Sequence, residues 1–277
     1  MNGTVVRTLS GIGFVAVTLA CLLLNQYLFA AYVIAIMIAM MAEFYRMPFG
    51  REKYRFIRAL AILSGVVLFC LIFARPAFGM PARYTALAII PALLVMVSSI
   101  FIRDKSEFDK LSIIYTGMFY IAVPLSLSNL LVFRSGSFSG LLILCFFLII
   151  WASDVGAYIF GMAFGQRPGS RKLCPEISPK KSWIGLWGGM FFAVLAALIL
   201  HWTGLLEAGI LHCIVLAVLM DLAGVAGDLF ESLWKRHYGI KDSGNIIPGH
   251  GGALDRFDST LFAIPFGALY LALFNLI

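Results

Sequence analysis

Apolar runs of about 20 residues, long enough to cross a bilayer as helices, recur along the chain and constrain its fold most. A membrane β-barrel would instead show shorter segments of alternating polarity. The mean hydropathy is +0.95 and only 13% of residues are charged, whereas about a quarter are charged in soluble domains. The sequence therefore predicts an all-α polytopic membrane protein.

Polar interruptions divide the chain into about nine predicted transmembrane helices. Residues 9–42 contain no small-residue cleavage site, so we expect the first helix to stay in the membrane. A tight turn at Asn25-Gln26 separates the first two helices. The third is expected to end near Ala74, the sixth to span about Gly140–Ala163, the seventh to begin near Trp183 and the ninth to fill Asp258–Ile277.

The basic residues predict the topology. On this map 18 of the 21 Lys and Arg residues fall on one side, leaving Arg75, Arg83 and Arg134 on the other. Positive residues favour the cytoplasmic side, so we expect a cytoplasmic N-terminus and an external C-terminus. The net charge of +7 is then explained by the membrane topology, and no nucleic-acid partner is predicted.

Two regions are expected within this single membrane unit: scaffold helices over residues 1–137 and a catalytic region over 138–277. The five scattered cysteines show no metal-ligand spacing and are interpreted as packing residues.

Four acids lie within or at the ends of apolar runs: Asp154, Asp221, Asp228 and Glu231. Each would cost about 2.5–3.5 kcal/mol at the bilayer centre, so we expect them to face a polar interior. At helical spacing Asp221, Asp228 and Ser232 share one face. Asp255 and Asp258 follow, one helical turn apart. Converging carboxylates favour a hard cation such as Mg²⁺; the alternatives are helix caps and ion pairs, including Glu231 with Lys235.

Basic residues and glycines are predicted on the same cytoplasmic face. Lys180 and Lys181 lie beside the start of a helix, where charge and free N–H groups favour an anion; the alternative is a topological anchor. Glycines on both sides of His250 would let backbone approach a ligand closely. Carboxylates opposite basic groups are typical of Mg²⁺-dependent phosphoryl or nucleotidyl transfer.

Two blocks resemble the signature of the phosphatidate cytidylyltransferases, or CDP-diacylglycerol synthases. The first runs from Ser232-Leu-Trp-Lys235-Arg236 through Lys241-Asp242 to Pro248–Asp258, and the second joins Trp151–Tyr158 to Ile177–Trp183. Ile184 stands where members often carry Glu.

The resemblance implies the reaction CTP + phosphatidate → CDP-diacylglycerol + pyrophosphate, with Mg²⁺ and K⁺ as a second cation. It implies that Asp228 and Asp255 are metal ligands and, with Lys181, catalytic, and that Ser232 and Asp258 lie near the cation. Lys180, Lys181 and Arg256 would neutralise phosphates. Further implied substrate-binding residues are Asp154, Ser178, Ser182, Ser232, Lys235, Arg236, Lys241, His250, Gly251 and Gly252.

These substrates place the expected site at the cytoplasmic face of the membrane, open to lipid and to water. The short loops and compact chain favour a bacterial inner membrane, with a eukaryotic organelle as the alternative. Family resemblance also implies a homodimer. Three alternatives stay open: a CTP-dependent lipid kinase, a membrane prenyltransferase and an ion-coupled transporter. A transporter would be expected to show broken helices and an internal repeat, which the sequence does not.

Overall fold

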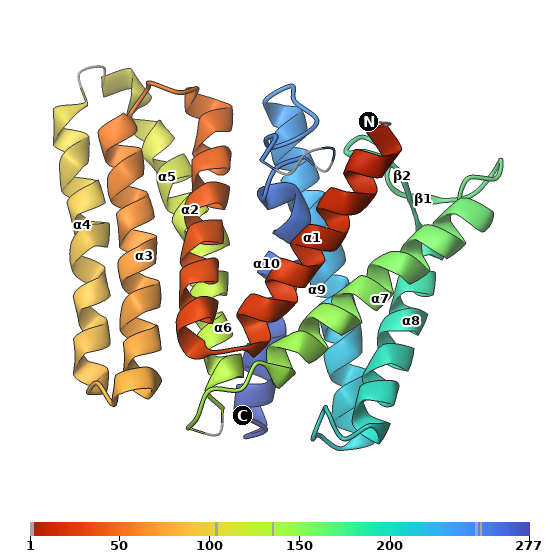
Figure 1. Ribbon diagram of the computed structural model, residues 1–277. Helices are drawn as coiled ribbons and strands as arrows, with labels where there is room; N and C mark the ends of the chain where they lie inside the picture. Colours follow the sequence, from red (N-terminus) through yellow and green to blue (C-terminus); the bar gives the residue numbers. More distant parts are fainter. Residues whose placement is uncertain (1–2, 103–104, 135, 247–248, 250) are drawn as a thin grey trace. The chain divides into compact units, whose positions relative to one another are not determined.

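The computed structural model describes residues 3–102, 105–134, 136–246, 249 and 251–277 (Figure 1). Within these residues, seven helices are long and apolar enough to cross a membrane. The predicted all-α polytopic membrane fold is confirmed, and the chain is an integral membrane protein. The count of nine spans and the sides of the termini stay predictions.

The chain forms two compact units, described here one by one. The first comprises Met1–Asn129, Phe133–Ser139 and Asp242–Arg256; the second comprises Leu130–Val132, Gly140–Lys241 and Phe257–Ile277. The functional division at residues 137 and 138 stays a prediction.

The first unit opens with α1 (Gly3–Leu23) and α2 (Gln26–Phe49), joined at the predicted turn. The Asn25 side chain accepts hydrogen bonds from the backbone N–H groups of Tyr27 and Leu28, each at 3.0 Å. These bonds satisfy donors that the first helical turn leaves open, which is why the apolar run breaks here.

The third helix, α3 (Arg55–Phe78), passes through Pro76 and ends one turn beyond the expected position near Ala74. Gly79 ends it at φ 67° and donates its N–H to the Ala74 carbonyl, a left-handed conformation that glycine adopts without steric cost. The other helices that begin in this unit are η1 (Ala82–Ala88), α4 (Ile89–Ser98), η2 (Ser99–Phe101), η3 (Lys105–Lys110), α5 (Leu111–Gly117), η4 (Met118–Ala122) and α6 (Val123–Val132).

The core of the first unit is aromatic and methionine-rich. Phe29, Phe44 and Phe69 are fully buried. Tyr45 is also buried, and its hydroxyl donates to the Ile114 carbonyl at 2.7 Å. A buried hydroxyl needs such a partner, so this bond joins α2 to α5.

The second unit contains α7 (Leu141–Ala163), α8 (Trp183–Trp202) and α9 (Ile210–His237), together with most of α10 (Leu254–Leu273). Helices α7 and α8 lie side by side (Figure 1). A Cβ on Gly156 would lie 2.5 Å from the Gly188 carbonyl oxygen, so glycine permits this close approach. Helix α10 begins one turn before the expected start at Asp258.

A two-stranded antiparallel sheet interrupts the helices, where the sequence predicted only a basic loop. Strands β1 (Lys172–Cys174) and β2 (Ser178–Ser182) pair Lys172 with Ser182 and Cys174 with Ser178. The short polar strands lack the apolar alternation by which strands are recognised, which explains why the prediction missed them. Strand β2 leads directly into α8 and positions the two lysines of the predicted anion site.

Candidate functional site

A pocket of about 500 Å³ lies in the second unit, between α7, the hairpin, α8, α9 and the start of α10. Its lining includes five residues predicted from the sequence: Asp154, Lys180, Lys181, Ser182 and Asp228. Four further polar residues were not predicted: Ser153, Tyr158, Gln166 and Ser259. The pocket therefore brings side chains of the second sequence block together with Asp228 of α9 and Ser259 of α10, which lie just outside the first block.

An ion pair lies in this pocket. Lys181 Nζ lies 2.5 Å from Asp228 Oδ2, with 26% and 31% of the two side chains exposed. Ser232, one turn further along α9, donates its hydroxyl to Asp228 Oδ1 at 3.3 Å. Because both charged groups are solvent-accessible, an incoming phosphate or cation can compete for them.

The hairpin is anchored behind Lys180. Gln166 Nε2 donates to the Lys180 carbonyl at 2.8 Å, and Lys172 Nζ donates to Gln166 Oε1 at 2.8 Å. These bonds fix the strand's backbone while leaving the Lys180 side chain exposed. Gln166 carries no charge or motif that sequence reasoning could have singled out.

The start of α8 is capped within the protein. Ser182 is buried and accepts the Gly185 N–H at 3.1 Å, and Trp183 N–H donates to the Arg171 carbonyl at 3.2 Å. Two of the N–H groups expected to attract an anion therefore have protein partners. The attraction of this site for an anion rests on the lysine charges.

Other carboxylates surround the ion pair. Asp154 lines the pocket, and Asp258 lies in the first turns of α10, which is apolar but outside the seven candidate spans found among the described residues. Burial, followed by the neighbouring carboxylates of Asp228 and Asp154, raises the pKa of Asp258 to about 7. Carboxylates this close favour a cation, because each destabilises the charge of the others.

Two acids of α9 have structural partners instead. Asp221 is buried and accepts a hydrogen bond from the Ser153 hydroxyl of α7. Glu231 is fully buried with Lys235 Nζ 2.5 Å from its Oε2. The predicted pairing of Glu231 with Lys235 is confirmed, but inside the protein and not on its surface.

The remaining predicted residues lie elsewhere in the described chain. Ser178 begins β2, Arg236 Nη1 donates to the Ile240 carbonyl at 3.1 Å, and Lys241 is exposed. His250 lies outside the described residues. The substrate contacts assigned to these residues stay predictions.

The glycine-rich segment belongs to the first unit, where Asp255 Oδ2 accepts three hydrogen bonds. Their donors are Ser243 N–H and Ser243 Oγ, each at 2.9 Å, and Gly252 N–H at 2.7 Å. Gly251 adopts φ 85°, where a Cβ would lie 2.6 Å from Asp255 Oδ2. The Gly252 N–H thus binds a carboxylate of the protein itself. The predicted roles of Gly251, Asp255 and Arg256 toward a ligand are not tested by these contacts.

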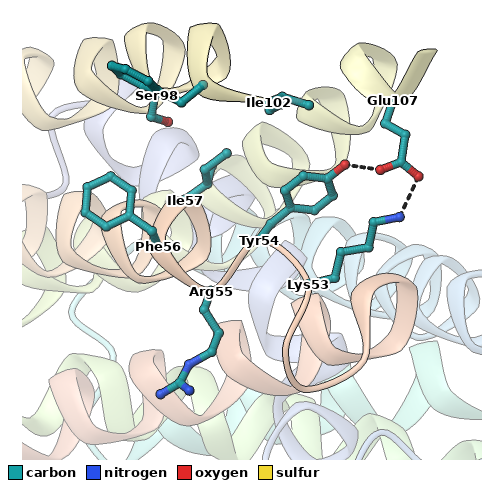
Figure 2. Close-up of a pocket in the computed structure, with 9 residues that line it drawn as sticks. Lys53, Tyr54, Arg55, Phe56, Ile57, Ser98, Ile102 and Glu107 are labelled. Atoms are coloured by element: carbon teal, nitrogen blue, oxygen red, sulfur yellow. Dashed lines mark hydrogen bonds and ion pairs between the residues drawn. The ribbon is translucent and has the colours of Figure 1, made fainter. Parts of the chain in front are cut away.

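Another pocket, of about 460 Å³, lies in the first unit (Figure 2). Glu107 accepts a hydrogen bond from the Tyr54 hydroxyl and pairs with Lys53 Nζ at 2.5 Å. The Arg55 side chain points away from the other labelled residues in Figure 2, and its Nη1 lies 3.4 Å from Glu52 Oε2. The basic side chains of this pocket therefore already pair with acids, and none of the residues that line the pocket belongs to the predicted site.

The described residues contain no group of three His, Cys, Asp or Glu side chains close enough to hold a metal by themselves. Mg²⁺ is commonly bound through one or two carboxylates, with substrate phosphates and water completing its shell. Asp228 and Asp258 fit that incomplete kind of site.

Comparison with known proteins bears on the same residues. The sequence model described as the cytidylyltransferase family matches residues 5–274. The phosphatidate cytidylyltransferase of Bacillus subtilis (strain 168) is 37% identical over 190 residues, which cover 68% of each chain. That of Rickettsia bellii (strain RML369-C) is 33% identical over 222 residues, 78% of this chain and 91% of the relative. That of Haemophilus influenzae (strain ATCC 51907 / DSM 11121 / KW20 / Rd) is 47% identical over 129 residues, 45% and 43% of the two chains.

Proposed function

The chain belongs to the cytidylyltransferase family, and on this premise we propose that it transfers CMP from CTP to phosphatidate. A phosphatidate phosphate oxygen attacks the α-phosphorus of CTP, and the bond from that phosphorus to the bridging oxygen of the β-phosphate breaks. The products are CDP-diacylglycerol and pyrophosphate. The names of the similar proteins support this substrate pair.

The accessible Lys181–Asp228 ion pair is the observation that carries the proposal. A phosphate oxygen can replace Asp228 as the partner of Lys181, which leaves the Asp228 carboxylate able to hold a cation. Lys180, on the same strand, adds a second positive charge beside the pocket. Binding two anionic substrates in line requires this neutralisation, and the phosphatidate oxygen is already an anionic nucleophile, so no dedicated general base is required.

The apolar rim of the pocket supports a lipid substrate. Tyr158 and Met162 line it and are 69% and 55% exposed, and Ile159 of the same helix is 46% exposed. A soluble protein would pay for such exposure, whereas a membrane protein presents it to lipid. Phosphatidate could keep its acyl chains in the bilayer while its phosphate reaches the lysines. We place the site at the cytoplasmic face of a bacterial inner membrane, where CTP is supplied.

Mg²⁺ would be held by Asp228 and Asp258, with Asp255 as a further ligand implied by the sequence signature. When bound, it would neutralise charge on the phosphates and orient them. Burial, followed by the carboxylates of Asp228 and Asp154, raises the pKa of Asp258, and these neighbouring carboxylates would supply the negative charge that such an ion needs. K⁺ would act as a second cation. Replacing K⁺ by choline in the assay tests whether CDP-lipid formation requires K⁺.

The proposal is tested by incubating the purified protein with phosphatidate and CTP. We expect a CDP-lipid and an equal amount of pyrophosphate, and loss of both when the divalent cation is chelated. Asp228→Asn should lower kcat by about 100-fold or more, because a catalytic metal contributes several kcal/mol. Glu176→Gln, which changes an exposed acid in the hairpin turn, is the matched control. Full activity of Asp228→Asn would overturn the site, and release of CDP without a CDP-lipid would indicate a kinase.

A further inference from the structure

A buried acid of α2, which the sequence prediction overlooked, contacts the glycine-rich segment of the first unit. Glu43 is only 6% exposed and lies among buried residues that include Met40, Met41 and Phe44. Withdrawing a carboxylate from water is costly unless hydrogen bonds replace the lost hydration. The donors that surround Glu43 are therefore informative.

Three donors converge on Glu43 from residues at least 200 positions away. Ala253 N–H donates to Oε1 at 3.0 Å, while Leu254 N–H and the Ser243 hydroxyl donate to Oε2 at 2.9 and 3.1 Å. Leu254 is the first residue of α10. Glu43 thus caps the start of α10 from another helix, and its negative charge is favourable at a helix N-terminus.

The same hydrogen bonds lead to Asp255. The Ser243 oxygen is 2.9 Å from Asp255 Oδ2 and 3.1 Å from Glu43 Oε2. Its single hydroxyl proton can serve one carboxylate at a time, so backbone N–H groups supply the other bonds. We call Glu43, Ser243, Gly252 and Asp255 the Glu43 network.

The glycines around Glu43 leave space for its side chain. A Cβ on Gly252 would lie 2.5 Å from Glu43 Oε2 and 2.2 Å from Ser243 Oγ. A Cβ on Gly244 would lie 2.4 Å from Glu43 Oε1. Any other residue at these positions would displace the carboxylate or the serine. Gly252 therefore serves close packing against a side chain of the protein, in addition to any contact with a ligand.

From this geometry we infer that Glu43 is a positioning residue, which holds the segment around Gly252 and Ala253 and so sets the orientation of Asp255. The inference rests on the proposed function, in which Asp255 is a metal ligand. A carboxylate fixed by a second set of hydrogen bonds is a more effective ligand, because its orientation does not have to be selected on binding. The N-terminal helices then contribute to the chemistry by orienting a ligand, beyond serving as a scaffold.

Glu43→Gln tests the inference with almost no change in size. The amide nitrogen of the glutamine would place a donor against the N–H of Ala253 or of Leu254. We expect the Mg²⁺ concentration for half-maximal CDP-lipid formation to rise by about 10- to 100-fold, the usual effect of losing a residue that orients a metal ligand. The rate of CDP-lipid formation at limiting Mg²⁺ should fall by about the same factor. Glu52→Gln, at an 81%-exposed side chain, should leave both unchanged.

Hydrogen exchange provides a readout that does not depend on activity. Without substrates, the amides of Ala253 and Leu254 should exchange slowly in the wild type and in Glu52→Gln, and markedly faster in Glu43→Gln. Unchanged exchange in Glu43→Gln would overturn the network. A lower yield of folded protein with an unchanged Mg²⁺ requirement would mean that Glu43 has only a structural role.

Ser243→Ala provides a second test of the positioning role, to be used if the Glu43→Gln variant does not fold. It removes the shared hydroxyl but keeps both backbone donors to Asp255, so the Mg²⁺ requirement should rise by less than in Glu43→Gln. An unchanged requirement would contradict the inference. Absence of CDP-lipid with the wild type would refute the proposed function, whereas wild-type activity with normal Glu43 and Ser243 variants would refute only the positioning role.

Discussion

Lys181 forms an ion pair with Asp228, the carboxylate that the proposed reaction assigns to a cation. Removing the lysine therefore tests whether it binds substrate or only packs against Asp228. Lys181→Ala should raise the KM for CTP about tenfold or more, because hydrogen bonds to charged groups contribute about 1.5–3 kcal/mol and each 1.4 kcal/mol is tenfold. Arg171→Ala removes the same charge from an exposed position before β1 and should leave KM unchanged. Steady-state kinetics would measure both KM values. An unchanged KM in Lys181→Ala would mean that the lysine serves only as a topological anchor.

Individual site residues differ in how well the sequence predicts them. Asp154 and Asp228 stand out because charge is rare in apolar runs, and Lys181 stands out because it lies beside the start of a helix. The pocket confirms that these three residues come together. Gln166 gave no comparable signal, whereas Glu43 also interrupts an apolar run and was overlooked. Glu43 acts through hydrogen bonds to residues 200 or more positions away, and such a contact leaves no local pattern.

Helices were predicted well because the apolar runs have the length of membrane spans, and two of the breaks end at side-chain caps, Asn25 and Ser182. The hairpin and the close contact of α7 with α8 were not predicted. In particular, the glycines of α7 and α8 do not reveal in sequence which helix they pack against. Only the structure assigns Gly156 to the backbone of Gly188.

This helix contact makes a prediction about stability. Gly156→Ala should destabilise the protein by about 1–3 kcal/mol, the usual cost of overpacking, because backbone and the Phe192 side chain both lie within 2.7 Å of the added carbon. Gly13→Ala meets nothing within 4 Å and should be neutral or stabilising by up to about 1 kcal/mol. Thermal unfolding in detergent compares them, and equal melting temperatures would argue against this packing.

For the whole molecule, the distribution of Lys and Arg predicts that the two termini lie on opposite sides. Seven candidate spans are found among the described residues, so the prediction depends on whether α1 and α10 cross as well. Crossing by both retains opposite termini, whereas crossing by only one would place them together. A reporter fused after Ile277 should be accessible from outside the cytoplasm. A cytoplasmic signal there, with a cytoplasmic N-terminus, would refute the nine-span topology.

The most direct test of the central claim follows the separate phosphates of CTP. Purified protein is given phosphatidate, Mg²⁺ and CTP labelled at either the α- or the γ-phosphate, and the lipid is then extracted. The account predicts that α-label enters the lipid and γ-label stays in the water phase as pyrophosphate. Entry of γ-label into the lipid would identify a CTP-dependent kinase. Failure of both labels to enter the lipid, with the protein folded, would contradict the proposed transfer.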